Sequence, residues 1–294
     1  MTPVLMPAPE SAATSAAPVG VRQASVTNWR GGRVQVLSDW LAEEVPVALV
    51  FNGISQAVMM ATPADLEDFA LGFGLTEGLL LDASELFGVE VHPACDGIEV
   101  QMEVSSACLA RLKERRRTLA GRTGCGLCGT DSLAQVRRTL PQVVPLSLDK
   151  QALSQAQRTL RSWQSMQQLT GASHAAAWCN AQGEVQWVRE DVGRHNALDK
   201  LVGALVRARV DAAAGFICIT SRASFEMVQK AAMAGVGTLA AVSAPTALAV
   251  DTALQCGLAL AGFVRGDDFV AYTQPQAFAL GLDAARPPGE TSWT

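Results

Sequence analysis

The sequence is poor in aromatic and charged residues, and it has only three histidines and one tyrosine. Aromatic residues make up 5% and charged residues 17% of its 294 positions, against 49% hydrophobic residues. This composition is typical of a globular chain with a large core, long enough for one large domain or two ordinary ones. The net charge of −5 gives no overall basic character, so the composition does not indicate nucleic-acid binding.

The sequence also lacks the usual signs of export or membrane insertion. Residues 1–20 contain no Lys or Arg and no compact apolar run, so we expect a disordered tail instead of a signal peptide. The stretch Ala231–Val250 carries no charge, but Gly235, Gly237 and Pro245 interrupt it. It therefore predicts a helix end, a strand, a turn and a second helix start, with no membrane span.

Seven cysteines are scattered through the chain without the even number and regular spacing of a disulfide framework. Free thiols in the reducing cytoplasm fit this pattern better. Cys179, Cys218 and Cys256 lie in apolar runs, so we expect them to be small core residues.

The most distinctive stretch is Gly121–Thr130, in which glycines flank Cys125 and Cys128. Glycine lacks a Cβ atom, so the surrounding backbone is free to move and to present the sulfur atoms. The basic run Arg111–Arg117 lies just upstream, and nearby cations favour the thiolate form of a cysteine. The stretch therefore predicts a reactive thiol pair.

Four interpretations of this pair remain open: a zinc site, a thioredoxin-like redox pair, a structural disulfide, and a carrier of sulfur as a persulfide. No second Cys-x-x-Cys or His pair has the spacing to complete a zinc site. The pair follows a basic helix, whereas a thioredoxin-like pair follows a strand. The residue types therefore favour relay or redox chemistry over metal binding or a structural role.

Residues 21–120 predict an α+β domain. Short apolar segments separated by turns indicate strands, and Asn52-Gly53 is typical of a hairpin turn. Thr62 is expected to cap a helix that has Pro63 in its first turn and continues to Glu77. The expected strands lie within 26–36 and at 46–51, 54–61, 87–91 and 98–104, and the expected helices at 62–77 and 105–119.

Residues 121–145 are expected to form the cysteine loop and a linker that includes a short segment at 131–140. Residues 146–294 predict a three-layer α/β domain with a partly parallel sheet, because strands alternate with helices. The expected strands are 174–180, 184–188, 216–220, 238–242 and 260–264. The expected helices are 150–168, one that opens within 190–200 and ends near 206, 224–234 and 246–259.

A polar turn between a strand and a helix predicts a binding site at Asp191-Val192-Gly193-Arg194-His195. Gly193 permits a tight turn, and the helix start offers N–H groups to an anion. Arg194 and His195 suit a phosphate or a purine edge. The alternative is that Asp191 caps the helix and His195 packs on its first turn. The contiguous Asp, Gly, Arg and His favour ligand binding.

A second polar turn follows the apolar strand at 216–220 and contains Ser221, Arg222 and Ser224. Ligands of open α/β sheets bind at the carboxyl ends of strands, so these residues suit phosphate contacts. Ser224 also suits the N-cap of the next helix. Val242–Thr246 repeats the pattern and is expected to form another wall of the same pocket. His174 begins a strand and is expected to be structural.

These stretches together resemble the formate dehydrogenase accessory sulfurtransferase family, FdhD. The resemblance spans about residues 20–275, and the combination of Gly-Cys-Gly-Leu-Cys-Gly with Glu-Asp-Val-Gly-Arg-His is far more specific than a lone Cys-x-x-Cys. The matching stretches are Glu44–Val50, Asn52-Gly53, Ala70–Phe73, Glu77-Gly78, Gly121–Gly129, Glu190–Lys200 and Ser221–Lys230.

The resemblance implies a cytoplasmic homodimer with a cytidine-deaminase-like C-terminal domain. It implies a sulfurtransferase that accepts sulfur from a cysteine desulfurase as a persulfide on Cys125, with Cys128 as its helper. The sulfur passes to the Mo-bis(molybdopterin guanine dinucleotide) cofactor, or its tungsten counterpart, before the cofactor enters the formate dehydrogenase apoenzyme. The cofactor is cargo, and the resemblance implies no permanently bound metal, no nucleic acid and no membrane.

By position, the resemblance assigns cofactor binding to the segment Phe263-Val264-Arg265-Gly266-Asp267-Asp268. The residue types of the polar turns also predict cofactor binding, at Asp191 and Ser224. The residues expected to hold the guanine-nucleotide phosphates are Arg194, His195, Ser221, Arg222 and Lys230.

The zinc set of a deaminase is missing, so the likeness to that fold is architectural. A zinc deaminase needs His-x-Glu and Pro-Cys-x-x-Cys. In this sequence Asn196 and Ala197 follow His195, and Gly124 precedes Cys125.

Two other functions remain open. A non-catalytic chaperone would bind the nucleotide cofactor and dock the apoenzyme without carrying sulfur, and a structural zinc protein would bind zinc stoichiometrically. The run Arg111–Arg117 would steer an acidic partner or the anionic pterin, or it is a solvated helix face.

Overall fold

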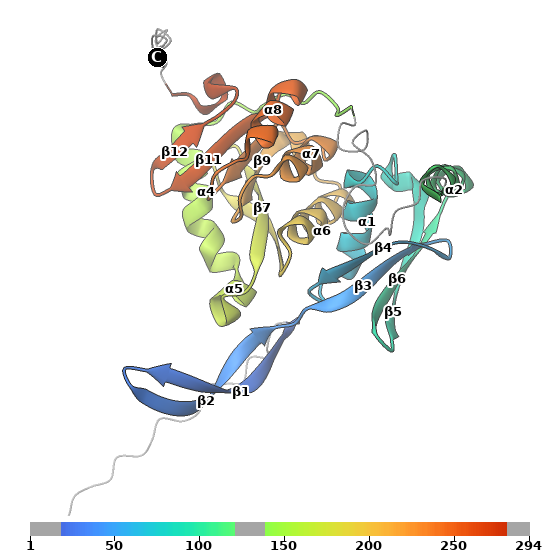
Figure 1. The fold of residues 1–294 in the computed structure, drawn as a ribbon. Coiled ribbons are helices and arrows are strands. Elements are labelled where there is room, and N and C mark those ends of the chain that lie inside the picture. Colours follow the sequence, from blue (N-terminus) through green and yellow to red (C-terminus); the bar gives the residue numbers. More distant parts are fainter. Residues whose placement is uncertain (1–18, 121–138, 281–294) are drawn as a thin grey trace, which may run out of the picture.

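The computed structural model describes residues 19–120 and 139–280, and these residues form three β-sheets with helices around two of them (Figure 1). The cysteine pair, most of the expected N-terminal tail, most of the segment at 131–140 and the last 14 residues of the 294 lie outside the described residues. The mixed α/β fold class expected from the sequence is confirmed.

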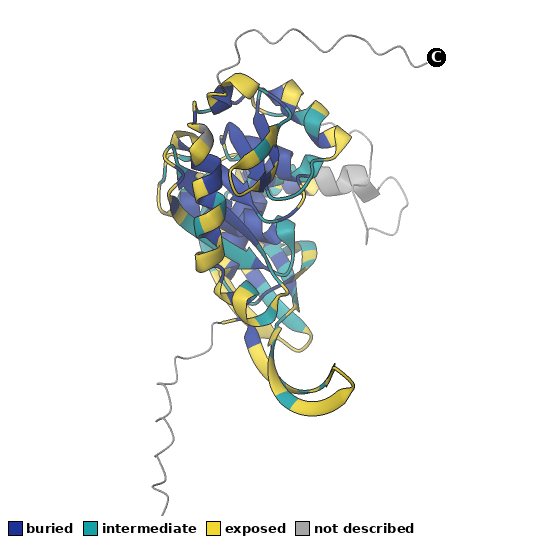
Figure 2. Cartoon of the chain, turned by 90° about the vertical axis from the view of Figure 1, so that its left-hand side faces the viewer, coloured by how far each residue is buried: buried dark blue, intermediate teal, exposed yellow. Residues whose placement is uncertain are grey.

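The first sheet is a two-stranded hairpin, which we call the arm. It consists of β1 (Val21–Arg30) and β2 (Arg33–Ala42), paired antiparallel along their whole length. The turn Gly31-Gly32 has positive φ at both residues, 58° and 79°, which glycine adopts without steric cost. The arm projects away from the rest of the molecule, and Figure 2 shows most of it as exposed.

The second sheet has the order β4-β3-β6-β5 and belongs to the N-terminal unit. Alternate residues of its central strands, such as Val47, Leu49 and Val100, are fully buried against α1, as the period of a strand requires. The elements of this unit are β3 (Val45–Phe51), β4 (Ile54–Ala61), α1 (Leu66–Thr76), β5 (Leu86–Ala94), β6 (Gly97–Val104) and α2 (Ser106–Ala120).

The start of α1 differs from the prediction. The helix begins at Leu66, and its N-cap is Asp65 in a left-handed conformation with φ 53°. Thr62, the expected cap, is fully buried, and its polar atoms contact the C-terminal unit. The expected N-cap at Thr62 is therefore wrong, because its backbone N–H and its hydroxyl form contacts with Asp191 and Val192 instead.

The third sheet has the order β12-β11-β10-β9-β7-β8 and forms the centre of the C-terminal unit. The helices α6, α7 and α8 pack on one face and α4 on the other, which gives the three expected layers. The strands are β7 (His174–Asn180), β8 (Val185–Asp191), β9 (Gly215–Ile219), β10 (Thr238–Ala241), β11 (Ala259–Arg265) and β12 (Asp268–Ala271). The helices are α4 (Lys150–Trp163), α5 (Ser165–Thr170), α6 (Arg194–Arg207), α7 (Phe225–Met233) and α8 (Ala247–Cys256).

Strands β9, β10 and β11 are parallel, whereas β7 is antiparallel to β9. The carboxyl ends of the parallel strands therefore meet the amino end of β7 at one edge of the sheet. The uncharged stretch 231–250 forms the end of α7, then β10, a turn and the start of α8, as predicted. Among the described residues, no helix has the length and apolar character needed to cross a membrane.

Two features of the C-terminal unit were not predicted. The expected helix over 150–168 is two helices, because Gln164 between them has ψ 74° and interrupts the helical hydrogen bonding. The short strand β12 pairs with β11 after a turn at Gly266. Its four residues are too few to show the alternation by which a strand is recognised.

The two units meet where α1 crosses α6. A Cβ atom on Gly72 would overlap the carbonyl oxygen of Asp199, and one on Gly203 would overlap the carbonyl oxygen of Asp68. Glycine at these two positions therefore lets the helix backbones touch. This crossing fixes how the N-terminal unit sits against the polar turns of the C-terminal unit.

Candidate functional site

Four cysteines are buried within the described residues, and burial raises the pKa of each thiol. They are Cys108, Cys179, Cys218 and Cys256. The effect raises the pKa of Cys218 to about 12. A buried thiol of this kind is a poor nucleophile, because the thiolate is the reactive form. Cys95 is exposed, at the turn between β5 and β6.

A buried carboxylate, Asp191, organises the turn at the start of α6. Its Oδ2 accepts hydrogen bonds from Lys200 Nζ at 2.6 Å and from the backbone N–H of Thr62 at 3.0 Å. Its Oδ1 accepts from the backbone N–H of Gly193 at 2.7 Å and from Asn196 Nδ2 at 3.0 Å. Asp191 and Lys200 are fully buried. Asp191 thus has four internal donors and holds the turn in place.

The same group of contacts joins this turn to the N-terminal unit. The backbone N–H of Val192 donates to Thr62 Oγ1 at 3.2 Å, and Lys200 Nζ donates to the carbonyl oxygen of Thr62 at 3.0 Å. Asn196 also donates to the carbonyl oxygen of Met60. The position of Arg194 and His195 therefore depends on residues about 130 positions earlier in the chain.

Arg194 and His195 begin α6 and lie beside His174. His195 Nε2 is 2.9 Å from Glu226 Oε2, and this contact lowers the pKa of Glu226 although burial opposes the shift. Burial lowers the pKa of His174, and the positive charge of Arg194 lowers it further. Arg194 Nε is buried without a hydrogen-bond partner among the described residues. The Nε–H group of Arg194 is therefore a hydrogen-bond donor without a partner among the described residues, and it lies beside the imidazole rings of His174 and His195.

The polar turns after β9 and β10 lie side by side. Ala223 forms a β-bridge with Pro245, and the backbone N–H of Thr246 donates to the carbonyl oxygen of Ala223. Ser224 occupies the N-cap position of α7, but its side chain makes no capping hydrogen bond, and its Oγ is buried without a partner among the described residues. Ser221 is buried, whereas Arg222 is exposed.

The segment 263–268 follows as the next turn along the same edge. The backbone N–H of Phe263 donates to the carbonyl oxygen of Ser243, which places this turn beside the one after β10. Phe263 has φ 54°, an uncommon conformation for a residue with a side chain, and its side chain is 42% exposed. Val264 is buried, while Arg265, Gly266, Asp267 and Asp268 are exposed. Asp267 accepts from Arg158 at 2.8 Å.

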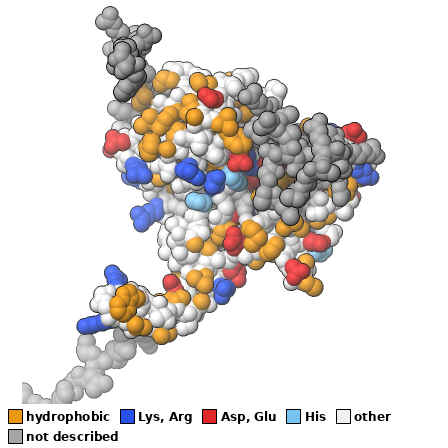
Figure 3. All heavy atoms as spheres, viewed as in Figure 1, with side chains coloured by type: hydrophobic (Ala, Val, Ile, Leu, Met, Phe, Trp, Pro, Cys, Tyr) orange, Lys and Arg blue, Asp and Glu red, His pale blue; other side chains and the backbone are white. Residues whose placement is uncertain are grey.

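A cavity of about 580 Å³ opens at this edge of the sheet, between the ends of β7, β9 and β10 and the helices α4 and α5. Its polar lining includes Arg161, Gln164, Gln168, Ser173, His174 and Thr220. This volume lies within the range found for small-molecule binding sites. Figure 3 shows basic and histidine side chains together on this face, between the regions of α4 and α6.

Glu190 fixes the α5 wall of the cavity. Its carboxylate accepts hydrogen bonds from the backbone N–H groups of Met166 and Gln167, both at 2.9 Å, and from Ser173 Oγ at 2.8 Å. A carboxylate at a helix N-terminus satisfies N–H groups that the helix leaves unpaired. The short helix α5 is therefore held to β8 by the residue that precedes Asp191.

The sequence profile of the FdhD/NarQ family matches residues 42–279, which is most of the described chain. The chain belongs to the FdhD/NarQ family. Relatives named "Sulfur carrier protein FdhD" include one from Variovorax paradoxus, 63% identical over 81% of this chain and 86% of its own length. Another, from Bordetella petrii, is 55% identical over 87% of this chain and 94% of its own length.

A solved structure from Desulfotalea psychrophila has the same fold. That protein, provisionally assigned as a formate dehydrogenase accessory protein, is 21% identical to this chain and superposes with a TM-score of 0.71. The alignment covers 88% of this chain and 99% of the other. The two-unit architecture is therefore shared with a distant structure. The cytidine-deaminase-like character of the C-terminal unit stays a prediction.

None of the predicted cofactor-binding residues of this FdhD/NarQ chain is among the described residues that line the cavity, and Lys230 lies elsewhere. Lys230 is buried at the contact of α7 with α1 and α6. Its Nζ donates to Asp199 Oδ1 at 2.8 Å, Asp199 Oδ2 at 2.9 Å and Glu77 Oε1 at 2.9 Å. Burial disfavours the charge of Lys230, but the two carboxylates outweigh it and raise its pKa. The ammonium group of Lys230 thus has internal partners in place of the expected phosphate.

The cavity residues on α4 and α5 were missed by sequence reasoning. The local signal for them is the glutamine- and leucine-rich composition of 150–168, which predicts one continuous helix. The break at Gln164 turns several amide side chains toward the sheet edge. His174, expected to be structural, lines the cavity as well.

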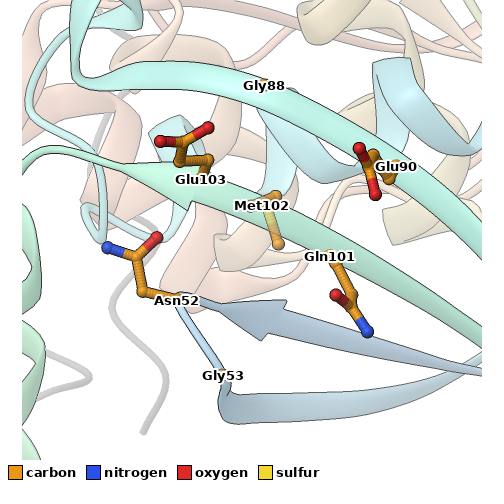
Figure 4. A pocket seen from close by; sticks show the side chains of 7 residues that line it. All are labelled: Asn52, Gly53, Gly88, Glu90, Gln101, Met102 and Glu103. Atoms are coloured by element: carbon orange, nitrogen blue, oxygen red, sulfur yellow. The ribbon is translucent and has the colours of Figure 1, made fainter.

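A second hollow of about 230 Å³ lies on the four-stranded sheet, next to the turn at Asn52 and Gly53. Figure 4 shows the carboxylates of Glu90 and Glu103 and the amide of Gln101 beside this hollow. Two carboxylates and no lining cation make it unsuited to a phosphate-bearing ligand. The cavity at the end of β7, β9 and β10 is the better candidate for nucleotide binding.

Proposed function

We propose that this protein is a sulfur carrier that accepts sulfur as a persulfide on Cys125 and delivers it to the Mo-bis(molybdopterin guanine dinucleotide) cofactor for formate dehydrogenase. The names of the relatives support sulfur carriage, and the accessory-protein assignment of the structural neighbour agrees with the formate dehydrogenase link. The observation that carries the proposal is the burial of the other thiols. Of the seven cysteines, four are buried, so Cys125, Cys128 and the exposed Cys95 are left to act as nucleophiles.

Sulfur acceptance is a thiol exchange. The Cys125 thiolate attacks the outer sulfur of a persulfide on a cysteine desulfurase. The new S–S bond forms at Cys125, the S–S bond of the desulfurase breaks, and the desulfurase leaves as a thiolate. No electrons are gained or lost overall. The reducing cytoplasm suits this step, because the chain would hold its other cysteines as free thiols there.

Sulfur release uses the second cysteine of the pair. The Cys128 thiolate attacks the sulfur of Cys125 that is bonded to the protein, which forms a Cys125–Cys128 disulfide and releases hydrosulfide toward the molybdenum of the cofactor. The sulfane sulfur is reduced and the two cysteines are oxidised by the same two electrons. A cellular dithiol reductant then reopens the disulfide for the next cycle.

We infer that the nucleotide end of the cofactor enters the 580 Å³ cavity and the turns beside it. Arg194 and Arg222 supply charge for phosphates, Ser224 supplies a free hydroxyl, and the exposed ring of Phe263 supplies an apolar surface for the base. Asp191 acts through the turn it holds, without contacting the cofactor. Lys230 is left out of this set, because its charge is already paired.

The test is mass spectrometry of the intact protein after incubation with a cysteine desulfurase and sulfur-labelled cysteine. The parent protein should gain about 32 Da, one sulfur atom, and lose it on treatment with a thiol reductant. The Cys125→Ala variant should gain nothing. The Cys128→Ala variant should keep the added sulfur longer than the parent, because the attack that releases it is removed.

The matched control is Cys95→Ala, which removes the other exposed thiol and should leave the gain unchanged. Labelling that persists in Cys125→Ala would overturn the relay. A parent protein that binds guanosine diphosphate but never gains sulfur would establish the alternative, a non-catalytic chaperone that binds the cofactor and docks the apoenzyme.

A further inference from the structure

Strand β5 lies at an edge of the four-stranded sheet, and the proposed sulfur chemistry does not use it. The sheet has the order β4-β3-β6-β5, so among the described residues β5 has a strand neighbour on one side only. Its nine residues, Leu86–Ala94, extend about 30 Å at about 3.3 Å per residue. A free edge presents a row of backbone N–H and C=O groups, which are able to pair with a strand of another chain.

The register of the sheet shows which residues of β5 turn these groups outward. The carbonyl oxygen of Met102 on β6 accepts from the backbone N–H of Asn52, which follows β3, at 2.9 Å. The backbone groups of Met102 therefore point away from β5. Val89 lies opposite Met102, so the two form a non-hydrogen-bonded pair, and the N–H and C=O of Val89 point to the free edge. Val91 is two positions further along β5 and has the same orientation.

An apolar groove of about 270 Å³ lies beside β5 on the face of the sheet that α1 covers. The apolar residues that line it are Leu71, Ala83, Leu86, Phe87 and Val89. Phe87 is 64% exposed, although large apolar side chains are usually buried. The two charged residues at the groove, Glu67 and Arg207, pair with each other at 2.7 Å. The groove therefore offers an apolar surface to an incoming side chain.

The 230 Å³ hollow described above lies against β5 on the opposite face, where Glu103 alternates with buried residues of β6 (Figure 4). Gly88 lines both the hollow and the apolar groove. Glu103 lies opposite Gly88, and its Oε2 is 3.9 Å from the position that a Cβ atom on Gly88 would take. Glu103 has no ion pair within residues 19–120 and 139–280, while Glu90 pairs with the exposed His92. Because Gly88 has no side chain, a long basic side chain is able to reach the Glu103 carboxylate across β5 from the free edge.

The two faces together select a pattern of side chains. In an extended chain, successive side chains point to opposite faces. A strand added to β5 therefore places every second side chain at the apolar groove and the others beside the carboxylates of the hollow. Main-chain hydrogen bonds supply the affinity of such a complex, and pockets for alternate side chains supply its specificity. The charge of the hollow favours basic over acidic side chains.

We propose that β5 binds an extended segment of a partner protein, in which basic residues alternate with apolar ones, as a fifth strand of this sheet. The backbone of the segment pairs with Val89 and Val91, and its apolar side chains enter the groove. Its Lys or Arg side chains reach Glu90 and, across Gly88, Glu103. The free edge, the apolar groove and the carboxylates of the hollow carry the proposal together. It concerns the recruitment of a partner protein and does not depend on the proposed sulfur chemistry.

The test measures the fluorescence anisotropy of a labelled peptide, Gly-Lys-Val-Lys-Val-Lys-Val-Gly, titrated with the full chain. A peptide with the same lysines and valines in two separate blocks has the same charge but lacks the alternation, so its dissociation constant should be at least about tenfold higher. The variant Glu90→Lys with Glu103→Lys should weaken binding of the alternating peptide at least about tenfold. Its matched control is Glu184→Lys with Asp251→Lys, which makes the same change of charge at exposed positions of the C-terminal unit and should bind the peptide as the parent does.

A second variant tests the backbone contact. Val91→Pro removes an N–H group that points to the free edge, so the pairing of β5 with β6 is kept while an added strand loses its partner. This variant should lose binding, whereas Val91→Thr, which keeps the N–H group, should bind the peptide as the parent does. Circular dichroism should show that both variants are folded. Equal binding of the alternating and the block peptide, full binding by Val91→Pro, or no binding by the parent would each overturn the proposal.

Discussion

Lys200 and Asp191 are fully buried partners, and their pairing determines the position of the turn that begins α6. Removing one charge of a buried pair leaves the other uncompensated, which usually costs about 3–5 kcal/mol. We therefore expect Lys200→Met to lower the free energy of unfolding by about that amount. Urea denaturation followed by circular dichroism measures this change.

The matched control for Lys200→Met is Arg158→Met, which breaks the ion pair between the exposed side chains of Arg158 and Asp267. Solvent screening limits such pairs to about 0–1 kcal/mol. Equal losses in the two variants would show that Lys200 contributes through its bulk alone.

His174 gives the protein a predicted dependence on pH. Burial and the charge of Arg194 lower the pKa of His174 from its ordinary value of 6.5. The ring is thus neutral in the folded protein at a pH where it is protonated in the unfolded chain, so unfolding takes up a proton. The stability that His174 contributes is present above pH 6.5 and is lost as the pH falls below this value.

Denaturation curves of the parent protein and of His174→Gln, measured between about pH 7.5 and pH 5.5, test this dependence. The stability advantage of the parent over the variant should shrink as the pH falls. An advantage that grows toward acid pH would contradict the burial argument. The exposed His92 provides a second comparison, through His92→Gln.

At the scale of elements, the crossing of α1 and α6 depends on two glycines. Gly72→Ala would place a methyl group against the carbonyl oxygen of Asp199, where backbone on both sides prevents relief. We expect this variant to lose about 1–3 kcal/mol of stability, the usual effect of overpacking. Thermal unfolding measures it.

Gly74→Ala in the same helix is the matched control. Its methyl group would meet the end of the buried Leu80 side chain, which yields more readily than backbone does. Alanine also favours the helix over glycine by about 0.5–1 kcal/mol. Gly74→Ala should therefore be nearly neutral or stabilising. A similar loss for both variants would show that α1 as a whole, and not the crossing point, is sensitive to substitution.

The elements also show how far the sequence alone predicted this structure. The apolar runs 46–51 and 216–220 predict the strands β3 (Val45–Phe51) and β9 (Gly215–Ile219), because their length and flanking turns are local properties. The break at Gln164 was not predicted, since residues on both sides of it favour a helix and contacts distant in sequence, such as those with Glu190 and Thr62, hold α5 in place. The helical wall of the cavity depends on this break and was therefore not predicted from the sequence.

At the scale of the whole molecule, the unpredicted features are contacts between the two units. Thr62 binds Asp191, and Glu77 binds Lys230, across more than 120 residues of sequence in each case. The hydrophobic periodicity of the sequence does not indicate such a pairing, because the pairing arises only when α1 lies on α6. The sequence therefore indicated Lys230 as a phosphate ligand, whereas the fold gives it carboxylate partners.

Asp199 and Lys200 are neighbours on α6, yet successive residues of a helix point about 100° apart. Asp199 pairs with Lys230 near the C-terminal end of α1, and Lys200 pairs with Asp191 and Thr62 just before its N-terminal end. The opposite charges at these two adjacent positions therefore each have a different matching partner. Rotating or sliding α6 against α1 by one residue would bring each charge to the wrong partner, so the two halves of the molecule fit together in a single orientation.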